Sequence, residues 1–271
     1  MKLIKDVENI ADEDKIIALQ VLNRLKVGDR VFGNVAEGLK ETLSNLEKDL
    51  DNIEKNKNEL DYLDNDGEIK SQIRMIKAGI KGEEALGEYF EKVVKLDDKL
   101  QDLVIFASLS DPDQNAIGNE NGYIADSDFV AVYGNYILIL DAKNITTSPE
   151  LPIYLDGNDL VTVGGQPILE LHPSTHIWKN IFQKNRTPYV SIHGCVVIVN
   201  KKGALVWKNP EWYRSEVKPI HISDLVPFLH EWIKDKDPET NLSILTTLAK
   251  MQIKKEESIL DLSASRRRFG I

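Results

Sequence analysis

The spacing of hydrophobic and polar positions predicts a helical region at the start of the chain. We expect a helix over residues 1–27, with a broad apolar stripe at residues 16–25. Leu and Ile then recur in alternating steps of four and three through residues 39–60. The same spacing resumes over residues 69–80, after a polar break at residues 64–67. Such spacing lines apolar side chains along one face of a helix, as in a coiled coil. We therefore expect residues 1–78 to contain an α-helical coiled-coil hairpin.

The second helix of this region is expected to begin near Asp29, and its apolar seam is interrupted by Lys57. A two-helix hairpin covers such a seam on one side only, which predicts self-association through residues 39–63. A polar residue in the seam weakens an assembly of this kind but helps to fix its register. The pattern therefore predicts a homo-oligomer formed through the N-terminal coiled coil.

Beyond residue 78 the pattern changes to short apolar runs separated by Gly, Pro, Asn and Asp, which is typical of strands. The two clearest runs, residues 129–133 and 136–140, flank the dipeptide Gly134-Asn135. This dipeptide is typical of a two-residue hairpin turn. We expect an α/β domain over residues 79–235, followed by a C-terminal helix and basic tail over residues 236–271.

Counting outward from that turn places four polar residues at the open end of the hairpin. Asp128 faces Asp141 and Asp126 faces Lys143, and the alternation of strand side chains puts all four on one face. Directly opposed carboxylates lie roughly 5 Å apart and repel each other unless a cation lies between them. Oxygen ligands with no Cys or paired His nearby favour Mg²⁺ or Mn²⁺ over Zn²⁺. The pattern predicts a metal site; the alternative is that the acids merely end two strands in solvent.

An acidic residue opening one strand, followed by D/E-x-K closing the next, resembles the signature of the PD-(D/E)xK nucleases. More narrowly, the chain resembles the nuclease-related domain (NERD) family, because Gly79–Glu83 fits its G-x-x-G-E helix motif. The resemblance covers residues from about Gly79 to Trp232. It implies a restriction-endonuclease-like mixed sheet flanked by helices, here preceded by the helical hairpin. It also implies metal-dependent hydrolysis of phosphodiester bonds in DNA.

The resemblance assigns a role to each candidate residue. Asp128 and Asp141 are expected to hold Mg²⁺ or Mn²⁺, together with the backbone carbonyl of Ala142. Glu83 is expected to reach the metal directly or through water, although by sequence alone it is only a Glu beside an apolar stripe. Lys143 is expected to position the attacking water or to stabilise the transition state.

Overall composition, the cysteine count and the net charge each add to the prediction. The chain has 271 residues, of which 42% are hydrophobic and 29% charged, as in a globular protein with one sizeable core and an accessory element. Its single cysteine, Cys195, excludes an intramolecular disulfide framework, and the chain shows neither a signal peptide nor a long apolar run. We therefore expect a cytoplasmic protein with no membrane partner. The net charge of −10 disfavours an ordinary nucleic-acid binder unless the acids are segregated.

Two other functions stay open. A chain that keeps the nuclease fold without turnover would bind nucleic acid or act as a scaffold, which the acidic balance favours. His176 also favours this inactive protein, because the NERD pattern has Gln at that position. In the third interpretation the coiled coil is the functional part and the α/β domain is an interaction module.

Two smaller features also have two interpretations. A basic stripe runs along the helix expected to start near residue 69 and consists of Lys70, Arg74, Lys77 and Lys81. It is either a solvated helix face or a contact to a phosphate backbone. His176 either lines the site edge or packs near Trp178. Its pairing with His172 as a zinc site is disfavoured, because Pro173 lies between them where a helix is expected to begin.

Overall fold

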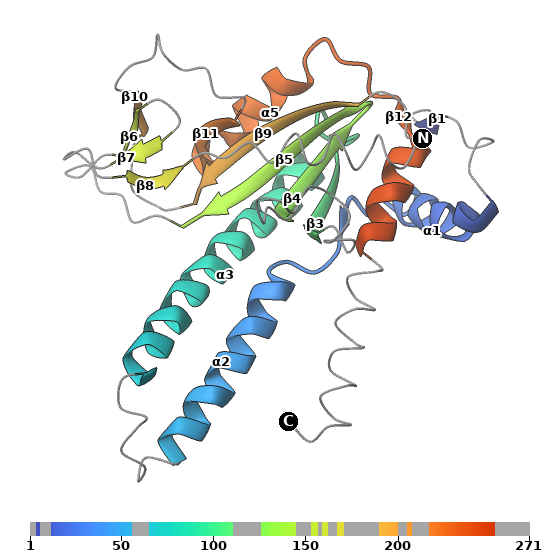
Figure 1. Cartoon of the computed structure of the whole chain (residues 1–271). Helices are drawn as coiled ribbons and strands as arrows, with labels where there is room; N and C mark the ends of the chain where they lie inside the picture. Colours follow the sequence, from blue (N-terminus) through green and yellow to red (C-terminus); the bar gives the residue numbers. More distant parts are fainter. Residues whose placement is uncertain are drawn as a thin grey trace, which may run out of the picture.

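A mixed β-sheet flanked by helices organises the part of the chain that the structure describes (Figure 1). The structure is a computed structural model, and it describes residues 4–5, 12–55, 65–110, 126–144, 153–156, 159–161, 167–170, 190–199, 205–207 and 217–252. This architecture confirms the expected mixed α/β class.

Six strands of the described chain form the main sheet: β2 (Val31–Phe32), β3 (Val104–Ser110), β4 (Asp126–Tyr133), β5 (Tyr136–Lys143), β9 (Ser191–Ile198) and β11 (Val217–His221). Their order is β11-β9-β5-β4-β3-β2. β3, β4 and β5 form an antiparallel meander, while β2 runs parallel to β3, β9 to β5, and β11 to β9. The strands that carry the predicted acids therefore lie at the centre of the sheet.

Two smaller sheets are also present in the described ranges. The first has the order β10-β6-β7-β8 and consists of β6 (Ile153–Asp156), β7 (Asp159–Val161), β8 (Pro167–Glu170) and β10 (Leu205–Trp207). The second pairs β1 (Ile4–Lys5) with β12 (Thr240–Asn241) in parallel.

The main helices are α1 (Lys15–Lys26), α2 (Glu37–Lys55), α3 (Asn65–Leu96) and α5 (Leu225–Ile233), and residues 242–252 are also helical. The helix expected over residues 1–27 is wrong at its start, because Ile4–Lys5 is a strand. Gly28 ends α1: its φ of +81° suits glycine, and its amide donates to the Leu25 carbonyl at 3.1 Å.

The second helix begins at Glu37 and not near Asp29, because Val31 and Phe32 form β2. The ring of Phe32 stacks on Phe106 with 5.0 Å between centroids, and the guanidinium carbon of Arg24 lies 4.0 Å from the Phe32 centroid. Arg24 also donates to the Val31 carbonyl at 3.0 Å. Pairing with β3 and these tertiary contacts override the local helical pattern.

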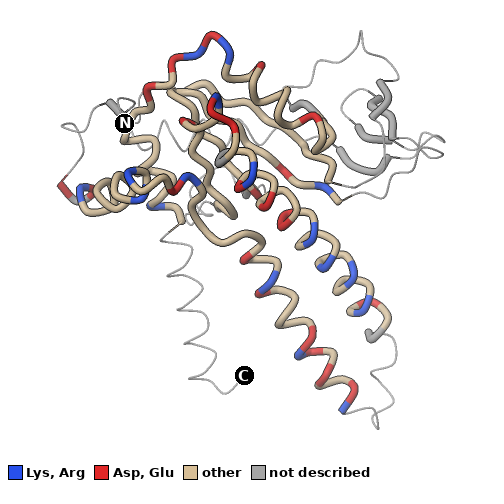
Figure 2. The backbone as a smooth tube through the Cα atoms, turned by 180° about the vertical axis from the view of Figure 1, so that it is seen from behind, with Lys and Arg blue, Asp and Glu red and all other residues tan. Residues whose placement is uncertain are grey.

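α2 and α3 lie side by side and together extend away from the sheet (Figure 1). Ion pairs join them: Lys77 to Glu47 at 2.8 Å, Lys40 to Glu84 at 2.8 Å and Lys70 to Glu54 at 3.6 Å. Basic residues follow one another along the outer half of α3, while α2 carries acids as well as bases (Figure 2). α3 runs unbroken past residue 78, so the expected domain boundary falls inside one helix.

The core lies on both faces of the main sheet. On one face, Leu86 and Phe90 of α3 and Leu225 of α5 pack against strand residues that include Phe129 and Cys195. On the other face, residues of α1 and of the 242–252 helix pack against the strands; they include Val21, Leu25, Leu245 and Leu248. α3 is thereby fixed directly over the strands that carry the acids.

Among the helices in the described ranges, none combines the length and the apolarity needed to cross a membrane.

Candidate functional site

The β4–β5 hairpin has the register predicted from its turn. Tyr133 pairs with Tyr136, and the ladder continues outward to the pair of Phe129 and Leu140. Gly134 adopts a φ of +60° in the turn, and its amide donates to the Thr240 side chain at 3.0 Å. Asp128 and Asp141 are the next residues outward, as the count from the turn requires.

Each of these two aspartates has a partner at the end of the ladder. Asp128 Oδ2 accepts a hydrogen bond from the backbone amide of Ala142 at 2.6 Å. Asp141 Oδ1 accepts one from Lys143 Nζ at 2.7 Å, with side chains 40% and 33% exposed, respectively. At least one oxygen of each carboxylate is therefore engaged within the hairpin.

Glu83 reaches the same place from α3. It is only 7% exposed, although burial of a carboxylate is costly unless charge or hydrogen bonds compensate it. Its charge acts on both Asp128 and Lys143. The structure therefore brings the four predicted side chains together, and Glu83 is not the solvated residue that its sequence context alone suggests.

A close approach of α3 to the strand ends presents Glu83 to the hairpin. A Cβ atom on Gly82 would lie 3.1 Å from Asn144 Cβ and 3.2 Å from Val199 Cγ2. Asn144, the residue after Lys143, donates from Nδ2 to the Ala78 carbonyl at 3.0 Å. Sequence analysis missed Asn144; its only signal is its position directly after the D-x-K motif.

The carboxylates alter the proton affinities of the site. Burial, followed by the charges of Asp141 and Glu83 and a hydrogen bond with Asp141, raises the pKa of Asp128 well above its ordinary value; the Ala142 amide opposes this. Burial alone would lower the pKa of Lys143, but Asp141, Asp128 and Glu83 outweigh it, so that the pKa is raised. Lys143 therefore keeps its charge, while Asp128 retains a proton more readily than an ordinary Asp.

The donor chemistry at this site fits a hard divalent cation, because carboxylate oxygens are the ligands that Mg²⁺ and Mn²⁺ prefer. In the described part of the chain, however, no group of three or more His, Cys, Asp or Glu side chains has the geometry to hold a metal ion. Two carboxylate oxygens instead accept hydrogen bonds, Asp128 Oδ2 from the Ala142 amide and Asp141 Oδ1 from Lys143. A cation at this site would be held by carboxylate oxygens of Glu83, Asp128 and Asp141.

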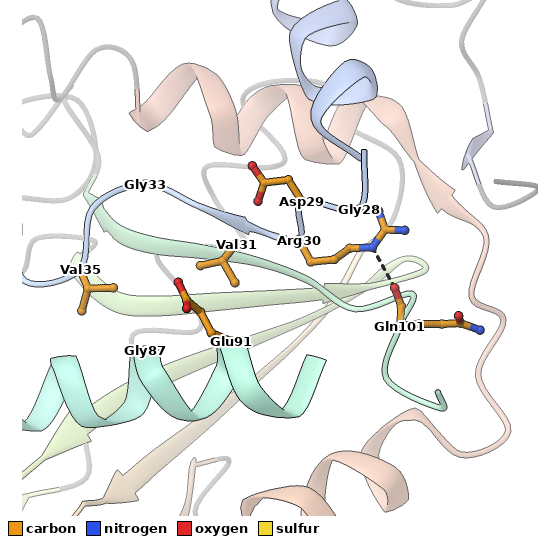
Figure 3. Close-up of a pocket in the computed structure, with 9 residues that line it drawn as sticks. All are labelled: Gly28, Asp29, Arg30, Val31, Gly33, Val35, Gly87, Glu91 and Gln101. Carbon is orange, nitrogen blue, oxygen red and sulfur yellow. Dashed lines mark hydrogen bonds between the residues drawn. The ribbon is translucent and has the colours of Figure 1, made fainter. Parts of the chain in front are cut away.

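A pocket of about 430 Å³ lies elsewhere, between α3 and the edge of the sheet (Figure 3). Arg30 lines it but donates to the Gln101 carbonyl at 2.9 Å, which ties two loops together. Asp29 lies 2.6 Å from the Arg24 guanidinium. None of the four predicted site residues lines this pocket, so it provides no support for the predicted chemistry.

Several expectations lie outside the described residues, among them Lys57 of the predicted seam and the basic tail after residue 252. The side chain of Asp126 is not described, although its backbone begins β4 opposite Ser110 of β3. His172 and His176 are in the range between 170 and 190 that the structure does not describe.

The close approach at Gly82 leads to a prediction about two glycines of α3. Gly67→Ala meets nothing within 4 Å and is expected to stabilise the protein by about 0.5 kcal/mol through helix propensity. Gly82→Ala is expected to destabilise it by about 1 kcal/mol, because overpacking against Asn144 and Val199 outweighs the same gain. Thermal unfolding of the two variants provides the comparison; equal stabilisation by both would contradict the close contact.

Comparison of the chain with protein-family models, with curated proteins and with solved structures finds no match.

Proposed function

We propose that this chain is a divalent-metal-dependent nuclease that hydrolyses phosphodiester bonds in DNA. The observation that supports the proposal is the convergence of Glu83, Asp128 and Asp141 with Lys143 at one end of the central hairpin. This convergence costs stability, because like charges oppose one another in a half-buried place. The fold is proposed to be restriction-endonuclease-like, with the helix that carries Glu83 packed over the strands that carry the other three residues.

The proposed mechanism divides the work among the four side chains. Asp128 and Asp141, with Glu83, would hold a divalent cation beside the hairpin. The chemistry that such a cation would supply is a lower pKa for a coordinated water and neutralisation of charge on the phosphate. Lys143 remains protonated and donates to the phosphoryl oxygens as charge develops on them, which stabilises the transition state more than the ground state.

A second candidate function is nucleic-acid binding without turnover. Two observations favour it: Lys143 forms an ion pair with Asp141, and no three-carboxylate metal geometry is found among the described residues. Such a protein would bind DNA equally well in EDTA and in Mg²⁺. Turnover is therefore what separates the two proposals.

The test is an assay of the full chain on supercoiled plasmid, linear duplex, single-stranded DNA and RNA. We expect cleavage of at least one DNA substrate with Mg²⁺ or Mn²⁺ and none in EDTA. Binding without cleavage under every metal condition would favour the second candidate, a nucleic-acid-binding protein without turnover. Preferential cleavage of RNA would change the proposed substrate from DNA to RNA.

We also propose that α2 mediates self-association. Within its described residues, Glu37–Lys55, none is buried, although Leu39, Leu46 and Leu50 lie at coiled-coil spacing. Among the described elements, α3 packs against α2 without burying any of the described α2 residues. Light scattering is expected to give a mass above that of the monomer, and Leu46→Glu with Leu50→Glu is expected to restore the monomer mass. A monomeric wild-type chain at micromolar concentration would contradict the proposal.

A further inference from the structure

One length of α3 carries cations and no acids. Between Ile69 and Gly82 the charged residues are Lys70, Arg74, Lys77 and Lys81. Steps of four, three and four residues place them on one stripe of the helix. Figure 2 shows this basic stripe as a row of blue segments that leads along α3 toward the sheet.

The four cations differ in their partners. Lys70 and Lys77 face α2, where they pair with Glu54 and Glu47. Arg74 and Lys81 are exposed, and neither forms an ion pair with a described residue. Arg74 donates from Nε only to a backbone carbonyl of its own helix. Within the described part of the chain, two charges of the stripe therefore have no ion-pair partner.

The stripe ends at the carboxylate site. Lys81 directly precedes Gly82, where an added Cβ atom would lie 3.1 Å from Asn144 Cβ. Asn144 Nδ2 donates a hydrogen bond to the carbonyl of Ala78. Ala78 lies four residues after Arg74 and three before Lys81, which places it on the same side of α3 as these two residues. A molecule lying on Arg74 and Lys81 would thus extend directly toward Lys143.

We infer that Arg74 and Lys81 form a docking track for the phosphate backbone of a nucleic-acid strand, which guides the strand to the carboxylate site. The two residues are about 10 Å apart along the helix axis, a length over which one strand of a duplex presents roughly three phosphates. The partner class rests on the proposed function. A protein of net charge −10 with an acidic site repels a polyanion such as DNA overall. The track would supply the local positive charge that attracts the strand to the site.

The contacts expected here are to phosphates, which position a strand without reading its sequence. We therefore test binding with labelled DNA of arbitrary sequence, using fluorescence anisotropy of the full chain in EDTA so that no cleavage occurs. Arg74→Ala with Lys81→Ala is expected to weaken binding about tenfold and to reduce the slope of log K against log salt by about 2.

The matched control is Lys48→Ala with Lys55→Ala on α2. Both lysines are exposed and lie seven residues apart, like Arg74 and Lys81. Their substitution therefore removes the same amount of charge from the pair of helices α2 and α3. This control is expected to bind within about twofold of wild type. An equal loss in both double variants, or no loss in either, would overturn the inference, as would polyglutamate competing as well as DNA.

The outcome is separable from that of the proposed function. A wild-type chain that cleaves DNA while the Arg74 and Lys81 variant binds normally refutes the track and leaves the nuclease. A chain that never cleaves, but loses binding only in that variant, refutes the nuclease and supports the track.

Discussion

Asp128→Asn is expected to give a protein that folds at least as well as wild type and does not cleave DNA. Asn retains an oxygen that can accept the hydrogen bond from the Ala142 amide. It removes a charge that Asp141 and Glu83 repel. The gain in the free energy of unfolding in EDTA is expected to be about 0.5 kcal/mol at neutral pH. Cleavage is lost, because a hard cation binds a neutral amide weakly.

This gain should depend on pH in a defined direction. Burial and the neighbouring carboxylates raise the pKa of Asp128 in the folded protein, so the folded state binds the proton more tightly than the unfolded chain does. The resulting stabilisation is complete below the unfolded pKa of about 3.9 and is lost as the pH rises through the folded value. The advantage of Asp128→Asn over wild type should therefore be larger at pH 7.5 than at pH 4.

Thermal melts in EDTA at both pH values, beside a cleavage assay, provide the measurement. Asp49→Asn on α2 is the control, because Asp49 is exposed and far along the chain from the site; neither stability nor cleavage should change. An Asp128→Asn protein that melts well below wild type in EDTA and still cuts DNA would identify the cluster as a structural ion network.

Lys143→Ala is expected to lower the cleavage rate by about 10²- to 10³-fold while metal binding persists, because the ammonium acts on charge that develops in the transition state. In the metal-free protein, Lys143 occupies Asp141 Oδ1. Its removal frees this oxygen, so the affinity for Mg²⁺ should be equal to that of wild type or higher. Lys143→Ala also removes the ammonium that pairs with the carboxylates, so the melting temperature in EDTA should fall.

Single-turnover cleavage at saturating Mg²⁺ separates these effects on Lys143 from a loss of metal. Lys92→Ala is the matched control: Lys92 pairs with Glu88 at 3.4 Å on the exposed surface of α3, where an ion pair contributes little. Cleavage by Lys143→Ala within about twofold of wild type would remove Lys143 from the mechanism.

The parts of the fold and site that sequence predicts are those fixed by local patterns. The turn at Gly134-Asn135 and the alternation of the flanking strands determine the hairpin register, and thereby the opposition of Asp128 and Asp141. The resemblance to nucleases pointed to Glu83, which the residues alone did not.

The features that sequence could not predict depend on partners distant in the chain. β2 exists because Val31 and Phe32 pair with β3, more than 70 residues later. β1 pairs with β12 near the other end of the described chain. The bond from Asn144 to α3 likewise joins positions far apart in sequence. No local spacing reports such contacts.

Mg²⁺ binding measured by calorimetry in the absence of nucleic acid is the most direct test of the central claim, that the opposed carboxylates form a metal site. We predict saturable binding to the wild-type chain that Asp141→Asn abolishes. We also predict proton release that increases as the pH is lowered toward the raised pKa of Asp128, because a ligand must lose its proton to bind the metal. Identical, unsaturable heats from wild type and Asp141→Asn would contradict the claim.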